Sequence, residues 1–241
     1  MPRAGAGAVL GTAHSDGAAR QRYALLLAAI IAVFVVSGTV TPTPEIQIVI
    51  SMLLGATLLL ALATVRARRG VVLGARAVVL AVIALSVVEA LNGNVDGRAT
   101  HVAYAFLVGL APPAIVLGVV RTLRARQAVT LEAVFGVLCV YILLGLFFAF
   151  VYGALNRVDG GSFFASGQTA TSAHCVYFSF ITLTTVGYGD FTARTNLGHT
   201  LSASEALLGQ IYLVTVVSLI VANVGRSRPR AGIAEPDAVE R

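Results

Sequence analysis

The sequence predicts an all-α integral membrane protein, with six transmembrane helices and a short re-entrant segment between the fifth and the sixth. Two observations lead to this fold class. Hydrophobic residues make up 57% of the 241 residues and charged residues only 12%, whereas an average soluble domain has roughly 45–50% and about 25%. The apolar residues also gather in long uninterrupted runs. A soluble enzyme is nearly excluded, because so few charged residues cannot cover its surface.

Six apolar runs of about 18–22 residues are long enough to cross a hydrocarbon core of about 30 Å as helices. Helices are expected because lipid offers no hydrogen-bond partner to the backbone. A shorter apolar run at 175–183 cannot cross. The six runs are 23–40, 46–65, 71–91, 102–120, 131–152 and 206–224.

The arginines set the orientation of these runs. All 17 basic residues are Arg, and they cluster before the first run and after the second, fourth and sixth. The loops on the other side hold only Arg98, Arg157 and Arg194. The positive-inside rule then predicts a multi-pass protein of the cell (plasma) membrane with both termini cytoplasmic. Alternatively, the first run is a cleaved signal peptide, although its apolar core is longer than the usual ~7–15 residues.

The remaining composition divides the chain further. Residues 1–22 are rich in Gly and Ala and are predicted to be a disordered cytoplasmic N-terminus. The first four runs, 23–120, are expected to form a four-helix peripheral transmembrane bundle. Cys139 and Cys175 are too few for a disulfide framework and are interpreted as free thiols. The tail at 226–241 is predicted to be cytoplasmic and too short to fold as a ligand-binding domain.

The segment 172–190 reads SAHCVYFSFITLTTVGYGD, an apolar helix candidate followed at once by a glycine-containing loop. Ordinary helices and strands do not aim successive carbonyl oxygens to one side. Gly187 and Gly189 permit the positive-φ conformations that do so. A row of such oxygens can replace the hydration shell of a cation when several copies of the loop surround it.

The pentapeptide TVGYG at 185–189, after a short apolar helix and between two spanning runs, resembles the selectivity filter of the prokaryotic potassium channel family, within the pore-loop channel superfamily. The resemblance covers about 131–224 and is strongest over 178–190. It implies a re-entrant pore helix and filter loop between the fifth and sixth transmembrane helices, in an ion-channel pore domain at 129–225. It also implies a homotetramer in a lipid bilayer that conducts K⁺ passively.

The same resemblance implies roles for individual residues. The selectivity filter would consist of Thr185, Val186, Gly187, Tyr188 and Gly189. The K⁺ sites would lie at the first four of these, and the Thr185 hydroxyl would complete the innermost one. The side chains of Val186 and Tyr188 would point away from the axis. The filter would be supported by Thr184, Asp190, Tyr177 and Phe178.

Further expectations concern chemistry and partners. No catalytic constellation is recognisable, so no enzymatic activity is expected. K⁺ is expected as the permeant ion, without a cofactor or a nucleic-acid partner. Two alternative functions remain open: a K⁺ uptake transporter subunit, and a non-conducting membrane scaffold or sensor built on a channel fold.

The fourth run departs from the pattern of voltage-gated relatives, and Glu205 admits two interpretations. The fourth run carries no charged residue, so gating-charge movement is not expected, and Pro112 and Pro113 would kink or break its helix. Glu205 would stabilise the outer mouth or bond the neighbouring pore segment. The alternative is that it caps the first turn of the sixth helix, where a carboxylate is favourable.

Overall fold

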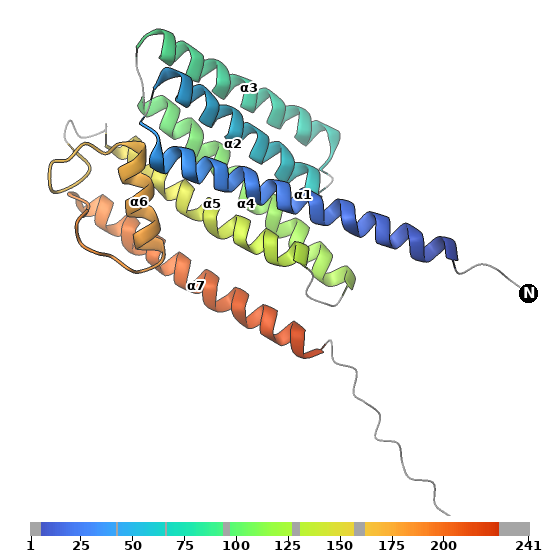
Figure 1. The fold of residues 1–241 in the computed structure, drawn as a ribbon. Helices are drawn as coiled ribbons and strands as arrows, with labels where there is room; N and C mark the ends of the chain where they lie inside the picture. Colours follow the sequence, from blue (N-terminus) through green and yellow to red (C-terminus); the bar gives the residue numbers. More distant parts are fainter. Residues whose placement is uncertain are drawn as a thin grey trace, which may run out of the picture.

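The computed structural model describes residues 6–41, 43–65, 67–93, 97–126, 131–156 and 162–226. These residues form seven α-helices and no strand, with one antiparallel bridge between Phe164 and Ala193 (Figure 1). The helices are α1 (Ala6–Thr39), α2 (Pro44–Val65), α3 (Arg69–Leu91), α4 (Arg98–Arg126), α5 (Leu131–Leu155), α6 (Ser172–Leu183) and α7 (Asn196–Arg226).

Five of these helices contain a stretch that is long and apolar enough to cross a membrane. The first five predicted runs are thereby confirmed as apolar helices of spanning length. The sixth predicted run, 206–224, lies within α7. Most side chains of α7 after Val216 lie outside the described residues, and α7 is not one of the five. The five stretches are Arg20–Thr39, Pro44–Val65, Arg69–Leu91, Arg98–Leu117 and Ala133–Leu155.

The long helices lie beside one another, and the short α6 stands between α5 and α7 near one end (Figure 1). Helix α2 packs against α1, α3 and α4, while α4 also packs along α5. Helix α1 contacts α2 on one side and both α5 and α6 on the other. The peripheral helices and the C-terminal helices are therefore joined chiefly through α1 and α4.

Two predictions about helix limits are wrong. Helix α1 begins at Ala6, so residues 6–22 are helical where the sequence predicts disorder. The reason is composition, because this stretch is rich in Ala, the residue with the highest helix propensity. Helix α4 continues past Pro112 and Pro113 without a break. Ala111, Ala114 and Ile115 beside the prolines are buried, so the helix keeps its packing at this point, and a kink at the prolines stays a prediction.

The ends of the chain limit two other predictions. Residues 1–5 and 227–241 lie outside the described residues. The predicted cytoplasmic tail at 226–241 therefore falls almost entirely outside them and stays a prediction. The two cysteines, Cys139 and Cys175, are free and buried, as interpreted from the sequence.

A polar network joins α2, α3 and α4 at one end of the peripheral bundle. The Ser51 and Ser86 hydroxyl oxygens lie 2.6 Å apart, and the Tyr104 hydroxyl donates to the backbone oxygen of Gln47 at 2.7 Å. The carboxylate of Glu89 is also buried and accepts a hydrogen bond from the Thr100 hydroxyl. Because polar groups buried in a membrane domain cost free energy unless they are paired, this network fixes how the three helices meet.

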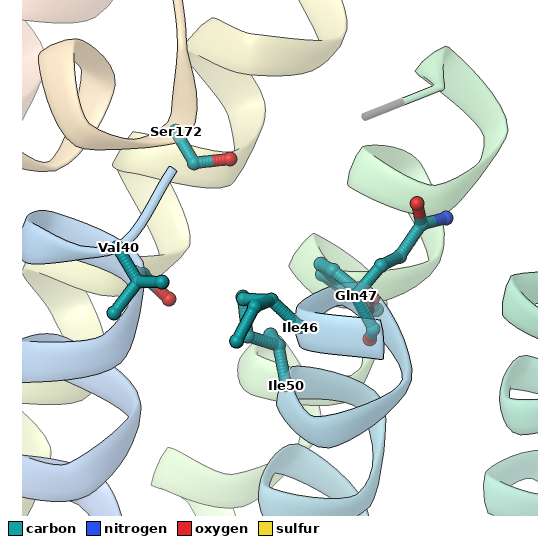
Figure 2. Close-up of a pocket in the computed structure, with 7 residues that line it drawn as sticks. Val40, Ile46, Gln47, Ile50 and Ser172 are labelled. Atoms are coloured by element: carbon teal, nitrogen blue, oxygen red, sulfur yellow. Dashed lines mark hydrogen bonds between the residues drawn. The ribbon is translucent and has the colours of Figure 1, made fainter. Parts of the chain in front are cut away.

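A small cavity of about 10 Å³ lies where the peripheral helices meet the start of α6. Ser172 reaches toward it from α6, opposite Val40 and the side chains of α2 (Figure 2). Among the described residues, the buried hydroxyl of Ser37 has no hydrogen-bond partner. A volume of this size matches one water molecule. The lining residues are Ser37, Val40, Ile46, Gln47, Ile50, Tyr104 and Ser172.

Candidate functional site

The loop at 184–190 is presented by the short helix α6. Thr171 caps this helix, because its hydroxyl accepts a hydrogen bond from the backbone N–H of His174 at 3.2 Å. Cys175, Ser179 and Leu183 share one face and are buried, so the helix packs against α5 and α7. Its 12 residues span about 18 Å, less than the ~30 Å hydrocarbon core. The C-terminal end carries partial negative charge, and the loop begins there.

The loop backbone alternates in handedness. Thr185 has a φ of 59°, Gly187 of 50° and Gly189 of 83°, so every second residue adopts a left-handed conformation. The sequence predicted the positive φ at the two glycines. It did not predict it at Thr185, a β-branched residue for which this region is an outlier.

The N–H groups of the loop are bound to the end of α6. The N–H of Val186 and the N–H of Gly187 both donate to the Ile181 oxygen, at 2.9 and 3.1 Å, and the N–H of Thr185 donates to the Thr182 oxygen at 2.9 Å. In a trans peptide the carbonyl points opposite to the N–H of the next residue. The carbonyl oxygens of residues 184–186 therefore point away from α6, in a row on the free side of the loop.

The predicted support residues tie the loop back to α6. The Tyr177 hydroxyl donates to the Asp190 carboxylate at 2.8 Å, and this carboxylate also accepts from the N–H of Phe191. The hydrogen bond to Asp190 raises the pKa of the Tyr177 phenol above its usual value. The Thr184 hydroxyl donates to the Phe180 oxygen at 2.6 Å. Both ends of the loop are thus anchored on one helix.

Phe178, the fourth predicted support residue, lies in an aromatic cluster behind α6. Its ring meets those of Tyr152, Phe163 and Phe164 at centroid distances of 5.2, 5.9 and 5.5 Å, all edge-on. Phe163 and Phe164 belong to the segment before α6, which returns across the bridge to Ala193. The cluster fixes α6 against α5 and against the segment that follows the loop.

The side chains of Val186 and Tyr188 are exposed by 52% and 73%. Apart from the glycine itself and its two chain neighbours, no atom of the described residues lies within 4 Å of a Cβ built on Gly187 or Gly189. Within the described part of the chain, the side chains of Val186 and Tyr188 are therefore only partly covered. The free side of the loop faces open space.

Glu205 is the side chain that joins α7 to the other two helices. It is fully buried, accepts a hydrogen bond from the Tyr152 hydroxyl of α5 at 2.6 Å, and accepts another from the Ser179 hydroxyl of α6 at 2.5 Å. Of the two interpretations of Glu205, bonding to the neighbouring segment agrees with its hydrogen bond from Ser179 of α6, and the place of that segment in a pore stays a prediction. The capping interpretation is wrong, because α7 begins at Asn196 and Glu205 lies well past its first turn.

Glu205→Ala is expected to lower the melting temperature of the purified protein, followed by circular dichroism. The substitution removes the acceptor of the buried Tyr152 hydroxyl, at about 1–3 kcal/mol, whereas the Ser179 hydroxyl keeps the Gly145 backbone oxygen, at 2.6 Å. Glu205→Gln keeps an acceptor and is expected to lie between Ala and wild type. Ser204→Ala is the matched control, because the Ser204 hydroxyl bonds only the Thr200 oxygen of its own helix. Equal melting of Glu205→Ala and Ser204→Ala would contradict this role.

Two further residues of α7 touch the loop and were not identified as site residues from the sequence. A Cβ on Gly209 would lie 2.5 Å from the backbone oxygen of Leu183, so α7 approaches the end of α6 as closely as a glycine permits. The side-chain amide of the next residue, Gln210, donates to the Thr185 hydroxyl at 3.2 Å. The sequence indicates these two residues only weakly, because one is a glycine and the other a single amide within an apolar run. Tyr152 and Ser179 gave no signal, because their role depends on where Glu205 lies.

The candidate ion ligands at this site are backbone carbonyl and hydroxyl oxygens. Within the described residues, no group of three or more His, Cys, Asp or Glu side chains is placed to hold a metal ion. The free carbonyl row and the Thr185 hydroxyl suit a weakly held, dehydrated monovalent cation better than a tightly bound metal.

Comparison with known protein families finds a match that includes the loop. The family model described as an ion channel matches residues 155–225, from the end of α5 through α6 and the loop to the end of α7. No solved structure matches the chain. Residues 155–225 are therefore similar to an ion channel domain, and the five apolar helices of spanning length indicate a multi-pass membrane protein.

Proposed function

We propose that the chain forms a potassium-selective channel that conducts K⁺ passively through a homotetrameric pore. One observation supports the proposal: the N–H groups of residues 185–187 bind the end of α6, so the carbonyl oxygens of residues 184–186 are directed away from that helix. Oxygens aimed this way replace the water shell of a dehydrating cation. The negative end of the α6 dipole lies at the same place and favours a cation.

The tetramer follows from the open side of the loop. One row of oxygens cannot surround an ion, whereas four rows around an axis can. The side chains of Val186 and Tyr188 support this arrangement, because much of each is exposed in a single chain and would be covered by neighbouring subunits. Exposed Leu207, Ile211 and Val214 on α7 would be covered by the neighbouring subunits and by lipid.

The membrane arrangement is part of the proposal. Helices α1 to α5 and α7 would supply six crossings in the plasma membrane, with both termini cytoplasmic and α6 entering from the outer side. Helices α5 and α7 would surround the ion path, and α1 to α4 would lie outside. Conduction is not voltage-gated in this proposal, because α4 carries no charged residue between Arg98 and Arg121.

The test is ion flux into liposomes that hold the purified full chain. K⁺ flux is expected to exceed Na⁺ flux by roughly an order of magnitude or more, because the filter geometry suits the larger ion. Planar-bilayer recordings are expected to show single-channel currents without steep dependence on voltage.

Three outcomes contradict the proposal. Equal K⁺ and Na⁺ permeability removes the selectivity. Slow flux that saturates with K⁺ concentration favours a transporter subunit. Absence of currents at every voltage and pH favours a non-conducting scaffold. Empty liposomes and liposomes with the Gly187→Ala variant serve as controls.

A further inference from the structure

Thr185 holds a conformation that its side chain disfavours. Among the described residues it is the one residue other than glycine with a positive φ. A non-glycine residue there costs on the order of 1–3 kcal/mol and persists only where its surroundings hold it. Such strain is concentrated at functional sites, and Thr185 begins the loop that carries the carbonyl row.

Two contacts hold Thr185 in place. Its N–H donates to the Thr182 oxygen at 2.9 Å, within the same turn. Its hydroxyl accepts from the Gln210 amide at 3.2 Å, and this second contact comes from another helix. Gly209 makes that contact possible, because any larger residue there would collide with the Leu183 backbone and hold α7 away from the loop.

The direction of the Gln210 hydrogen bond decides what the hydroxyl can do. A threonine hydroxyl has one proton and two lone pairs. The Gln210 amide nitrogen donates, so it occupies one lone pair and stops the hydroxyl from rotating freely. The other lone pair is then restricted to two positions, and the proton takes the one that is left. Gln210 itself is exposed, among exposed apolar side chains such as Leu208 and Ile211.

We propose that Gln210 is the positioning residue of the innermost ion site: its amide orients the Thr185 hydroxyl so that the hydroxyl oxygen serves as a cation ligand at the inner end of the loop. The inference rests on the proposed function and adds to it a specific contribution of α7. In the tetramer four Gln210 side chains lie in a ring below the filter, and each sets the hydroxyl of its own chain.

Ba²⁺ block of K⁺ flux reports on this site. Ba²⁺ is close to K⁺ in size and carries twice the charge, so it is attracted more strongly to the same oxygens. Gln210→Ala is expected to raise the half-blocking Ba²⁺ concentration by roughly threefold to tenfold, the effect of one hydrogen bond. Gln210→Asn keeps the amide but is one methylene too short to reach the hydroxyl, and it is expected to behave like the Ala variant.

A double-mutant cycle ties the effect to Thr185. In a Thr185→Ala background, Gln210→Ala is expected to cause no further change in Ba²⁺ block. In a Thr185→Ser background, which keeps the hydroxyl, the full effect of Gln210→Ala is expected to return. Ser204→Ala, on the same helix and bonded only to it, is expected to leave the block unchanged.

The outcomes separate this inference from the channel proposal. Wild-type protein that fails to conduct K⁺ overturns both. Wild-type protein that conducts, with Ba²⁺ block unchanged in Gln210→Ala and Gln210→Asn, overturns the role of Gln210 alone. An equal effect of Gln210→Ala with and without the Thr185 hydroxyl does so as well, because it shows that Gln210 acts elsewhere.

Discussion

Gly187→Ala is expected to abolish potassium-selective flux while the protein still folds and inserts. Gly187 has a φ of 50°, and an alanine held there costs on the order of 1–3 kcal/mol in each subunit. Flipping the peptide relieves this cost and turns a carbonyl oxygen out of the row. The measurement is K⁺ against Na⁺ flux in liposomes, together with circular dichroism of the purified variant.

Gly167→Ala is the matched control for this prediction. Gly167 also has a positive φ, of 76°, and has open space around it, but it lies in the segment before α6. The same backbone strain is therefore introduced away from the loop, and selective flux is expected to persist. Selective K⁺ flux in Gly187→Ala equal to that in Gly167→Ala would refute the proposed filter.

Gly209→Ala is expected to separate α7 from α6 and to abolish flux through loss of loop support. The added Cβ would lie 2.5 Å from the Leu183 backbone oxygen and 2.8 Å from its side chain. A backbone atom at the end of α6 cannot move aside without displacing the loop that follows it. Overpacking of this kind costs about 1–3 kcal/mol, occasionally more. Melting temperature and liposome flux are the measurements.

Gly74→Ala is the matched control for Gly209→Ala: the substitution is the same, but no loss of stability or flux is expected. Gly74 lies within α3, and a Cβ there meets no atom within 4 Å. Alanine is favoured over glycine within a helix by about 1 kcal/mol, so this variant is expected to melt at or above the wild-type temperature with unchanged flux. If Gly209→Ala and Gly74→Ala show the same melting temperature and the same flux, the close approach of α7 to α6 is not needed for folding or conduction.

The sequence predicted features that depend on local chemistry. Long apolar runs gave the spanning helices, since each run carries its own reason to be helical in lipid. The positive φ at Gly187 and Gly189 followed from residue type. Tyr177 and Asp190, which flank the loop closely in sequence, were also identified, and the structure joins them by a hydrogen bond.

The features that were missed depend on how distant helices meet. Ser179, Tyr152 and Gln210 are unremarkable polar residues until α5, α6 and α7 are placed side by side. For Glu205 the sequence left two interpretations, and only the start of α7 at Asn196 decided between them. The strain at Thr185 was also unforeseen, because it arises where the end of α6 captures the next N–H groups.

The capture of the loop N–H groups by the Ile181 oxygen affects the energetics of assembly. Because these contacts lie within one chain, the loop is preorganised in each subunit before any partner arrives. In the proposed tetramer little conformational entropy would be lost when subunits associate, so little of the association free energy would offset ordering of the backbone. The ion path would then form from loops that already have their backbone conformation in each separate chain.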